Sequence, residues 1–381
     1  MASHSYKPED VFWGQLGGCL EALEAGTTTI VDHAHISYTP EHNNAALSAT
    51  ISSGIRSIYC YCPTGRVKTW KPFEMEEELL PAWLFQQLTS LCNTGPFANG
   101  RVIMGFAFDS FYLPKDVVVN IFNQVRGLGI KTITSHYVPS LLPGSTVDLL
   151  ESYGLLEKDI LLSHATPLND SDAQKLQRVG ASIASTPDTE LQMGHGWPVC
   201  FQENARSISS LGIDCHSNNT GSIVAQMKVG LQAERARRNG RIHEAGKIPA
   251  KSDQIGSLEE GKIADLVIWD TLSPAMICAA EEDPIGAIIL HSAPSDIDAV
   301  IVDGQFRKRI GQLVTTKLEL ELMPNMKHEK SEVQWRDVAT ELLKSRQSIL
   351  ETEKASGADD REAGFENIVR IFGTDKDKLV Y

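Results

Sequence analysis

The run GIKTITSH, residues Gly129 to His136, is followed after a helical stretch by DILLSHA, residues Asp159 to Ala165. Both runs are short, rich in apolar and β-branched residues, and end at or beside a histidine. Short strands that alternate with longer helical stretches are typical of parallel βαβ units. The two runs therefore predict parallel strands whose carboxyl ends carry His136 and His164.

Five further runs continue this alternation along the chain. They are TTTIVDHAHI (residues 27–36), GIRSIYCY (54–61), RVIMGFAF (101–108), GASIAS (180–185) and ISSLGIDC (208–215). Glycines such as Gly129 and Gly180, close to the start of a run, suit the C-cap of a preceding helix. Seven strands are one fewer than a closed (β/α)8 barrel needs. The pattern predicts an α/β fold, a TIM-like (β/α)8 barrel that is incomplete.

The pattern changes after about residue 254. Apolar and polar residues alternate around glycine turns in IGSLEEGKIADLVIWD (255–270) and DAVIVDGQFRKRIGQLV (298–314), which predicts a small antiparallel β domain. A helical pattern begins at Ser331. We therefore expect a hydrolase-like barrel at residues 1–250, a partial β-sandwich at 251–320 and a C-terminal helical extension at 321–381.

Composition narrows the range of partners. The 381 residues carry a net charge of −14, from 35 basic and 49 acidic side chains. That balance disfavours a nucleic acid or an anionic membrane and leaves a small-molecule substrate. No apolar run approaches the roughly 18 residues that span a bilayer, and the first residues do not form a secretory signal. Seven cysteines without a C-x-x-C pair argue against a disulfide framework. A cytoplasmic location is the expectation.

Three residues that can carry chemistry fall at the ends of predicted strands: His136, His164 and Asp214. Catalytic groups of a (β/α) barrel collect at this edge. Imidazole and carboxylate ligands suit zinc or iron, and an open coordination position holds an acidified water. Each residue alone has a plainer interpretation, a hydrogen-bonded histidine or a turn aspartate. Three at equivalent strand positions favour function.

The chain resembles the amidohydrolase superfamily, in its cytosine deaminase-like and triazine hydrolase-like branch. The resemblance covers about residues 6 to 312. The stretches that carry it are PEDVFWGQLGGCLEALEAGTTTIVDHAHI, LLSHATPL, SLGIDCHSNNTGS, and IGSLEEGKIADLVIWD with VIVDGQ.

The resemblance implies one divalent metal, zinc or alternatively iron. The family holds the ion with an H-x-H pair on strand one, a His on strand five and an Asp on strand eight. His136 and Asp214 match the last two, and Asp214 would also take a proton from the metal-bound water. His164 matches a strand-six residue that contacts substrate or that water. The resemblance also favours a homodimer.

Two departures from the family pattern stand out. The H-x-H pair belongs before the segment that matches from Tyr6, so the chain is expected to be truncated and to lack strand one. His33 and His35 share one face of a strand and are candidate substitutes as metal ligands. They align with strand two, so lining the pocket is the preferred interpretation. The helix pattern expected between Gly240 and Gly256 is also shortened or absent.

The remaining candidates concern the substrate. His195 and Glu190 follow the seventh predicted strand and are candidate substrate contacts, with an ordinary surface loop as the alternative. Related deaminases carry a Glu shortly after the strand-five His, whereas here Tyr137 to Ser140 contain no carboxylate. This favours hydrolysis of a C–N or similar bond in a small cyclic substrate over deamination. The alternatives are an inactive barrel retained as a binding or regulatory partner, and an incomplete gene product.

Overall fold

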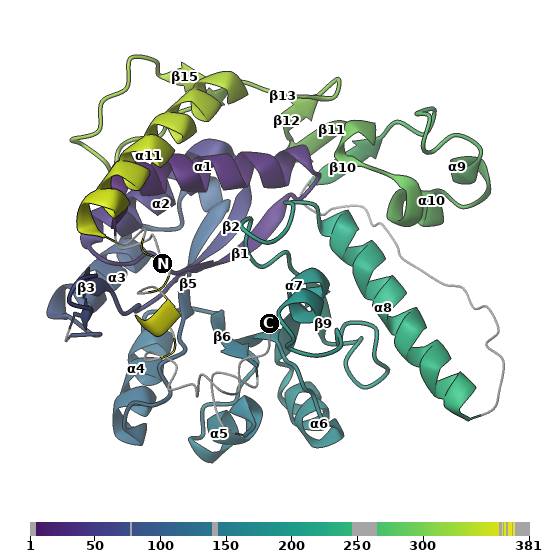
Figure 1. Ribbon diagram of the computed structural model, residues 1–381, viewed down its shortest axis with the longest axis horizontal. Helices are drawn as coiled ribbons and strands as arrows, with labels where there is room; N and C mark the ends of the chain where they lie inside the picture. The colour runs from purple at the N-terminus through teal and green to yellow at the C-terminus, as the bar shows by residue number, and fades with distance from the viewer. Residues whose placement is uncertain are drawn as a thin grey trace.

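A curled sheet of parallel strands forms the centre of the molecule (Figure 1). The computed structural model describes residues 5–76, 78–138, 144–245 and 265–357, together with residues 360, 362, 365–367 and 369. The sheet has seven strands in the order β1-β2-β5-β6-β7-β8-β9. Their bounds are β1 Thr29–Ala34, β2 Arg56–Tyr61, β5 Val102–Ala107, β6 Ile133–Tyr137, β7 Ile160–His164, β8 Ser182–Ser185 and β9 Ser209–Leu211. All seven predicted strands are confirmed.

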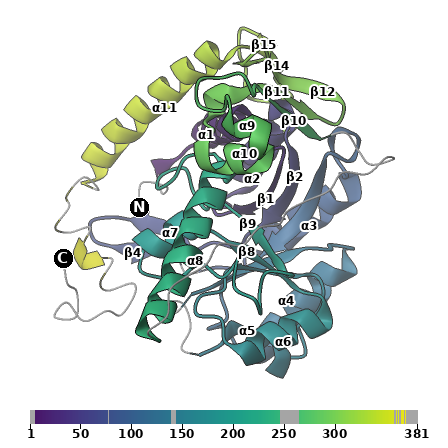
Figure 2. The ribbon, with the colours of Figure 1, turned by 90° about the vertical axis from the view of Figure 1, so that its right-hand side faces the viewer.

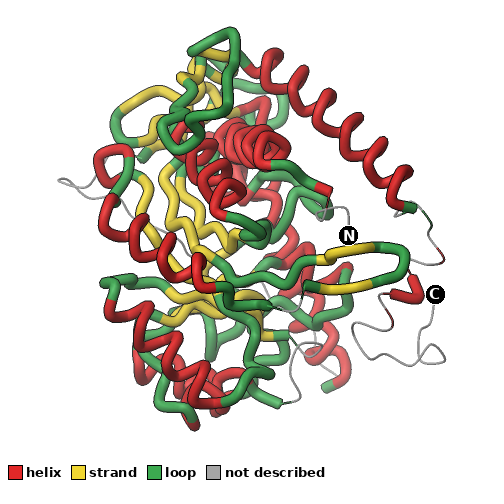
Figure 3. Tube along the Cα trace, turned by 90° about the vertical axis from the view of Figure 1, so that its left-hand side faces the viewer, coloured by secondary structure: helices red, strands yellow, loops and turns green. Residues whose placement is uncertain are grey.

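Helices cover the outside of this sheet, as the red segments beside the yellow strands show in Figure 3. Two of them end at Gly54 and Gly180, whose φ angles of 80° and 75° place them in the left-handed region that glycine tolerates. The helices are α1 Pro8–Glu24, α2 Pro40–Ser53, α3 Ala82–Thr94, α4 Lys115–Gly127, α5 Thr146–Ser152, α6 Asp170–Val179, α7 Pro187–Gln192 and α8 Ile223–Glu244. A short helix, η2 Ala98–Gly100, and a hairpin, β3 Val67–Thr69 with β4 Glu74–Met75, complete this part.

The sheet is an incomplete barrel, as predicted, because β1 and β9 form its two edges and do not pair with each other. Instead, α1 meets the loop after β9. The Gly221 N–H donates to Glu21 Oε1 at 2.9 Å, and the Thr27 hydroxyl donates to the Gly221 carbonyl at 3.3 Å. A Cβ at Gly221 would lie 3.2 Å from the Ala22 backbone nitrogen, so glycine permits this close approach.

Apolar side chains fill the space between the sheet and its helices. Phe106, Phe108 and Phe122 are fully buried, and the Phe108 and Phe122 rings meet edge to face with centroids 5.7 Å apart. Burial of aromatic rings on this scale stabilises the strands that carry the site. No helix within the described residues is long and apolar enough to cross a membrane.

A second, antiparallel sheet lies at one end of the molecule, close to β1 and β2 (Figure 2). Lys308, on its third strand, is fully buried and donates to the Glu24 carboxylate and to two backbone carbonyls. Arg56 of β2 also forms a two-pronged ion pair with Asp265. The strands are β10 Leu266–Trp269, β11 Ile297–Val302, β12 Gln305–Arg309 and β13 Gln312–Leu313, beside α9 Ala279–Glu282, α10 Pro284–His291 and η3 Pro294–Asp296. Residues 246–264, which include much of the predicted β-sandwich motif, lie outside the described residues.

The C-terminal helix, α11 Trp335–Ser356, begins later than the predicted Ser331. The preceding Glu332–Val333, β15, pairs instead with β14, Thr316–Lys317, and buries Val333. Asp337 then accepts a hydrogen bond from the Gln334 N–H, which fixes the start of the helix. In Figure 1, α11 lies alongside α1, and Leu342 of α11 lies against Gly17.

Candidate active site

Histidines gather at the carboxyl edge of the parallel sheet. His33 and Cys60 are partners across β1 and β2, and Tyr137 and His164 are partners across β6 and β7, and because all these strands are parallel their carboxyl ends share one edge of the sheet. The ring centroids of His33 and His136 are 4.5 Å apart, and those of His136 and His164 are 5.6 Å apart. His35 stacks on His33 at 4.5 Å. Parallel strands thus bring residues far apart in sequence to one place.

Asp109 lies among these rings and was not predicted from the sequence. Its Oδ2 accepts a hydrogen bond from His136 Nδ1 at 2.8 Å and lies 3.2 Å from His33 Nε2. Its Oδ1 accepts the backbone N–H of His136 at 2.7 Å. Asp109 follows the end of β5 by two residues, so the rule that selected His136, His164 and Asp214 applies to it equally.

The contacts of Asp109 set the charges in this cluster. Burial on its own would raise the pKa of Asp109, but the hydrogen bonds from His136 and His33 outweigh it and hold that pKa below its ordinary value. Burial alone would lower the pKa of His136, yet the hydrogen bond to Asp109 and its charge raise it. The arrangement therefore favours an ionised carboxylate between two imidazoles.

His164 is buried beside Glu190, a fully buried carboxyl group. His164 Nδ1 forms a 2.7 Å hydrogen bond with the Thr186 hydroxyl, and Glu190 Oε1 lies 3.8 Å from the same nitrogen. Burial, followed by the nearby His136, lowers the pKa of His164 to about 4. Burial also raises the pKa of Glu190 to about 7, although Thr186 N–H and the Ser185 hydroxyl donate to its carboxylate. His164 is therefore uncharged near neutral pH, whereas Glu190 titrates in that range.

The Thr186 residue links Glu190 and His164, since its N–H donates to the Glu190 carboxylate and its hydroxyl bonds to the His164 ring. His195 is half-buried on the loop that follows α7, and its ring centroid lies 5.4 Å from that of His164. The His195 N–H also donates to the Glu190 carbonyl at 3.0 Å, which ties this loop to the site. Contact of a substrate with either residue stays a prediction.

Asp214 lies just beyond β9, with an exposed side chain. Its φ of 65° and the φ of 68° at His164 are unusual for residues other than glycine, and such backbones are concentrated at functional sites. Asn219 holds the loop by donating to the Ile213 carbonyl at 2.7 Å. The negative charge of Asp214 acts on both His136 and His164.

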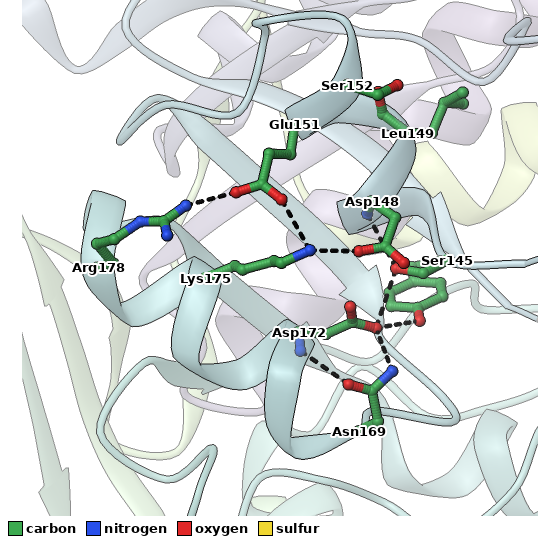
Figure 4. Close-up of polar contacts among 10 residues, drawn as sticks. Ser145, Asp148, Leu149, Glu151, Ser152, Asn169, Asp172, Lys175 and Arg178 are labelled. Carbon is green, nitrogen blue, oxygen red and sulfur yellow. Dashed lines mark hydrogen bonds and ion pairs between the residues drawn. The ribbon is translucent and has the colours of Figure 1, made fainter.

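A polar network fixes the end of β6 next to His136. The Asp172 carboxylate accepts hydrogen bonds from the Tyr137 hydroxyl at 2.6 Å, from Ser145 at 3.0 Å and from Asn169 at 2.9 Å. Figure 4 shows Asp172 between Ser145 and Asn169 at the start of α6. Because Tyr137 follows His136 directly, this network limits movement of the site histidine.

Two groups of side chains within the described residues have ligand atoms no more than 4.8 Å apart: His33 with His35 and Cys62, and His33 with Asp109 and His136. The two predicted ligands His136 and Asp214 therefore differ in placement, since only His136 belongs to such a group. His33 Nδ1 is buried and has no hydrogen-bond partner among the described residues. A buried ring nitrogen without a hydrogen-bond partner in the protein fits a site that holds a non-protein group, such as a metal ion.

The family profile for amidohydrolases matches residues 134–307, which contain His136, His164, Glu190 and Asp214. This match supports the resemblance of the chain to the amidohydrolase superfamily. It is 26% identical over 336 residues to a 5-methylthioadenosine/S-adenosylhomocysteine deaminase of Desulforudis audaxviator, which covers 82% of this chain and 74% of the relative. It is 24% identical over 340 residues to a 5′-deoxyadenosine deaminase of Methanopyrus kandleri, with coverage of 82% and 74%.

Solved structures of two other proteins share the fold of this chain. One is an adenosine deaminase of Xanthomonas campestris with bound zinc, at a TM-score of 0.64 and 17% identity, covering 90% of this chain and 76% of that one. The other is an atrazine chlorohydrolase of Arthrobacter aurescens TC1 complexed with zinc, at a TM-score of 0.67 and 16% identity, with coverage of 91% and 78%.

Proposed function

We propose that this protein is a metal-dependent hydrolase that breaks a C–N or similar bond of a small cyclic substrate. One observation carries the proposal. Within a chain that resembles the amidohydrolase superfamily, His33, His136 and His164 lie ring to ring at the carboxyl edge of the parallel sheet, with Asp109 between the first two. Such an edge is where enzymes of this architecture carry out their chemistry.

The residues of the site fit a divalent metal. Imidazole nitrogens and a carboxylate oxygen are the donors that zinc prefers, with iron as the alternative, and such atoms lie within 4.8 Å of one another here. His136 would hold the ion, and Asp214, His33 and His35 are the further ligands that the sequence predicts. A bound ion would supply an acidified water as the nucleophile.

The side chains of the protein then divide the proton transfers. We assign to Asp214 the role of base that takes a proton from the attacking water, because its carboxylate is exposed at the end of β9. His164, uncharged and hydrogen-bonded through Nδ1 to Thr186, offers Nε2 to the substrate or to that water. When the C–N bond breaks, Asp214 would return the proton that it took from the water to the leaving nitrogen.

The comparisons narrow the substrate class. The relatives are named as deaminases of adenosine derivatives, and the two structures as an adenosine deaminase and an atrazine chlorohydrolase. All of these substrates present a leaving group on a nitrogen-containing aromatic ring. We infer that the substrate is such a ring with an amino or comparable substituent. An inactive binding partner is not favoured, because the named relatives are enzymes and a group of possible metal ligands is present.

Several sequence-based expectations stay predictions at this point. They are the division of the chain at residues 250 and 320, the homodimer and the cytoplasmic location.

The test is a screen of the purified full chain loaded with zinc. Aminopurine nucleosides, aminopyrimidines and chloro- or amino-substituted triazines would be offered separately, with release of ammonia or chloride as the readout. We expect turnover of at least one class, and loss of that turnover on His164→Gln and on removal of metal with a chelator. Absence of turnover across all three classes by zinc-loaded protein would refute the proposal.

A further inference from the structure

We propose that the metal ion is bound by His33, Asp109 and His136, so that His33 and Asp109 take the place of the H-x-H pair of the superfamily. This ligand set deepens the proposed function and rests on it for the presence of a metal. It assigns Asp109 as a metal ligand and gives His33 two named co-ligands, Asp109 and His136. It leaves Asp214 outside the ligand set, in its role as the base.

The donor atoms match the requirements of a divalent ion. Two imidazoles and one carboxylate leave a fourth position open for water, as in hydrolytic zinc sites. Bonds of about 2.0–2.1 Å in a tetrahedron place neighbouring ligand atoms roughly 3.3 Å apart. His33 Nε2 and Asp109 Oδ2 are 3.2 Å apart, close to that separation. His136 Nδ1 and Asp109 Oδ2 are 2.8 Å apart, so a small displacement of one ring would admit an ion.

The backbone holds these three side chains from different strands. His33 lies on β1, Asp109 follows β5 and His136 lies on β6, all at the same edge of the sheet. The backbone N–H of His136 fixes Asp109 Oδ1 and leaves Oδ2 directed at the two rings. Ligands supported by regular elements and by additional hydrogen bonds keep the geometry that a metal requires.

A competing ligand group shares His33. Cys62 Sγ lies 3.5 Å from His33 Nε2, and His35 completes that group. This group contains a thiol, which gives a bound cobalt ion an intense near-ultraviolet absorption that imidazole and carboxylate ligands do not give. Substitution of cobalt for zinc therefore distinguishes the two groups directly.

The test measures metal affinity of the full chain after it has been stripped by a chelator. Zinc affinity would be determined by competition with a chromophoric chelator for the wild type and for Asp109→Asn and His33→Gln. Asparagine keeps an Oδ1 acceptor for the His136 N–H, so this variant preserves the local hydrogen bond. Asp32→Asn is the matched control, because Asp32 precedes His33 on the same strand and bonds to Gln15 on its other face.

We expect Asp109→Asn and His33→Gln each to weaken zinc binding by more than about 100-fold, beyond the loss typical of an outer-shell contact. Asp32→Asn and Cys62→Ser should leave the affinity unchanged, and cobalt-loaded protein should lack the thiolate band. Circular dichroism of each variant checks folding, and His33→Gln decides the question if Asp109→Asn does not fold.

Three results would overturn the ligand set. They are unchanged affinity in folded Asp109→Asn or His33→Gln, a thiolate band that disappears with Cys62→Ser, and a loss of affinity confined to Asp214→Asn. Because no substrate is present, these results are independent of turnover. Tight zinc binding with this ligand dependence but no hydrolysis would refute the proposed function alone.

Discussion

Replacement of Glu190 by glutamine should change how the stability of the protein depends on pH. The carboxyl group is fully buried, and burial is the main reason that its pKa rises from an ordinary value of 4.5 to about 7. The unfolded chain loses this proton at a lower pH than the folded chain does. Between these two values the folded state binds more protons, so the group lowers stability progressively as pH rises through that window.

The magnitude follows from the pKa difference. A shift from 4.5 to about 7 corresponds to about 3 kcal/mol, with the full cost reached above the folded-state pKa. Glutamine has the same shape, keeps an acceptor for the Thr186 N–H and does not titrate. The free energy of unfolding of Glu190→Gln relative to the wild type should therefore rise by about 2–3 kcal/mol between about pH 5 and pH 8.

Urea unfolding followed by tryptophan fluorescence measures this difference. A chelator in every buffer removes the contribution of bound metal. Glu203→Gln, at an exposed position, is the control and should show no pH-dependent difference from the wild type. A difference between Glu190→Gln and the wild type that is constant with pH, or that falls as pH rises, would show that Glu190 is charged in the folded protein.

Two further predictions concern the fold. Lys308→Met should lower the free energy of unfolding by about 3 kcal/mol, because the buried ammonium group and its three hydrogen bonds are lost. In the same urea assay, Lys317→Met at an exposed ion pair should leave the free energy of unfolding nearly unchanged. Gly105→Ala should destabilise the protein by about 1–3 kcal/mol in thermal melts, because a Cβ at this position would lie 2.6 Å from Cys60 Sγ. Gly127 has open space around it, so Gly127→Ala should be neutral or stabilising in the same thermal melts. Equal effects within either pair would contradict the packing described.

The strand pattern was readable because each parallel strand is short, apolar and preceded by helix. The same pattern predicts His136 and His164 at strand ends, where they lie in the structure. In a parallel sheet all carboxyl ends lie at one edge, so the direction of the chain is enough to predict this. The later start of α11 was not readable, because Val333 is drawn into a pair with β14 by a tertiary contact rather than by local propensity.

The cluster of side chains around Asp109 could not be predicted from the sequence alone. The sequence favours a pocket-lining role for His33 and His35, because they align with the second strand of the family barrel. Their closeness to His136 depends on the curl of a sheet whose first strand in this chain is β1. Asp109 lies one residue beyond the predicted strand at residues 101–108, and this position at a strand end is the sequence feature that indicates a functional role for it. A carboxylate at a strand end indicates a site only when another functional side chain, here the His136 ring, lies beside it.

The most direct test of a metal-dependent site at the carboxyl edge is an anomalous difference map at the zinc absorption edge, from crystals of the zinc-loaded protein. We expect one peak at His136, with His33 and Asp109 at ligand distances of about 2.0–2.2 Å. A zinc-loaded crystal with no peak at this edge of the sheet, or with the peak remote from His136, would contradict this expectation.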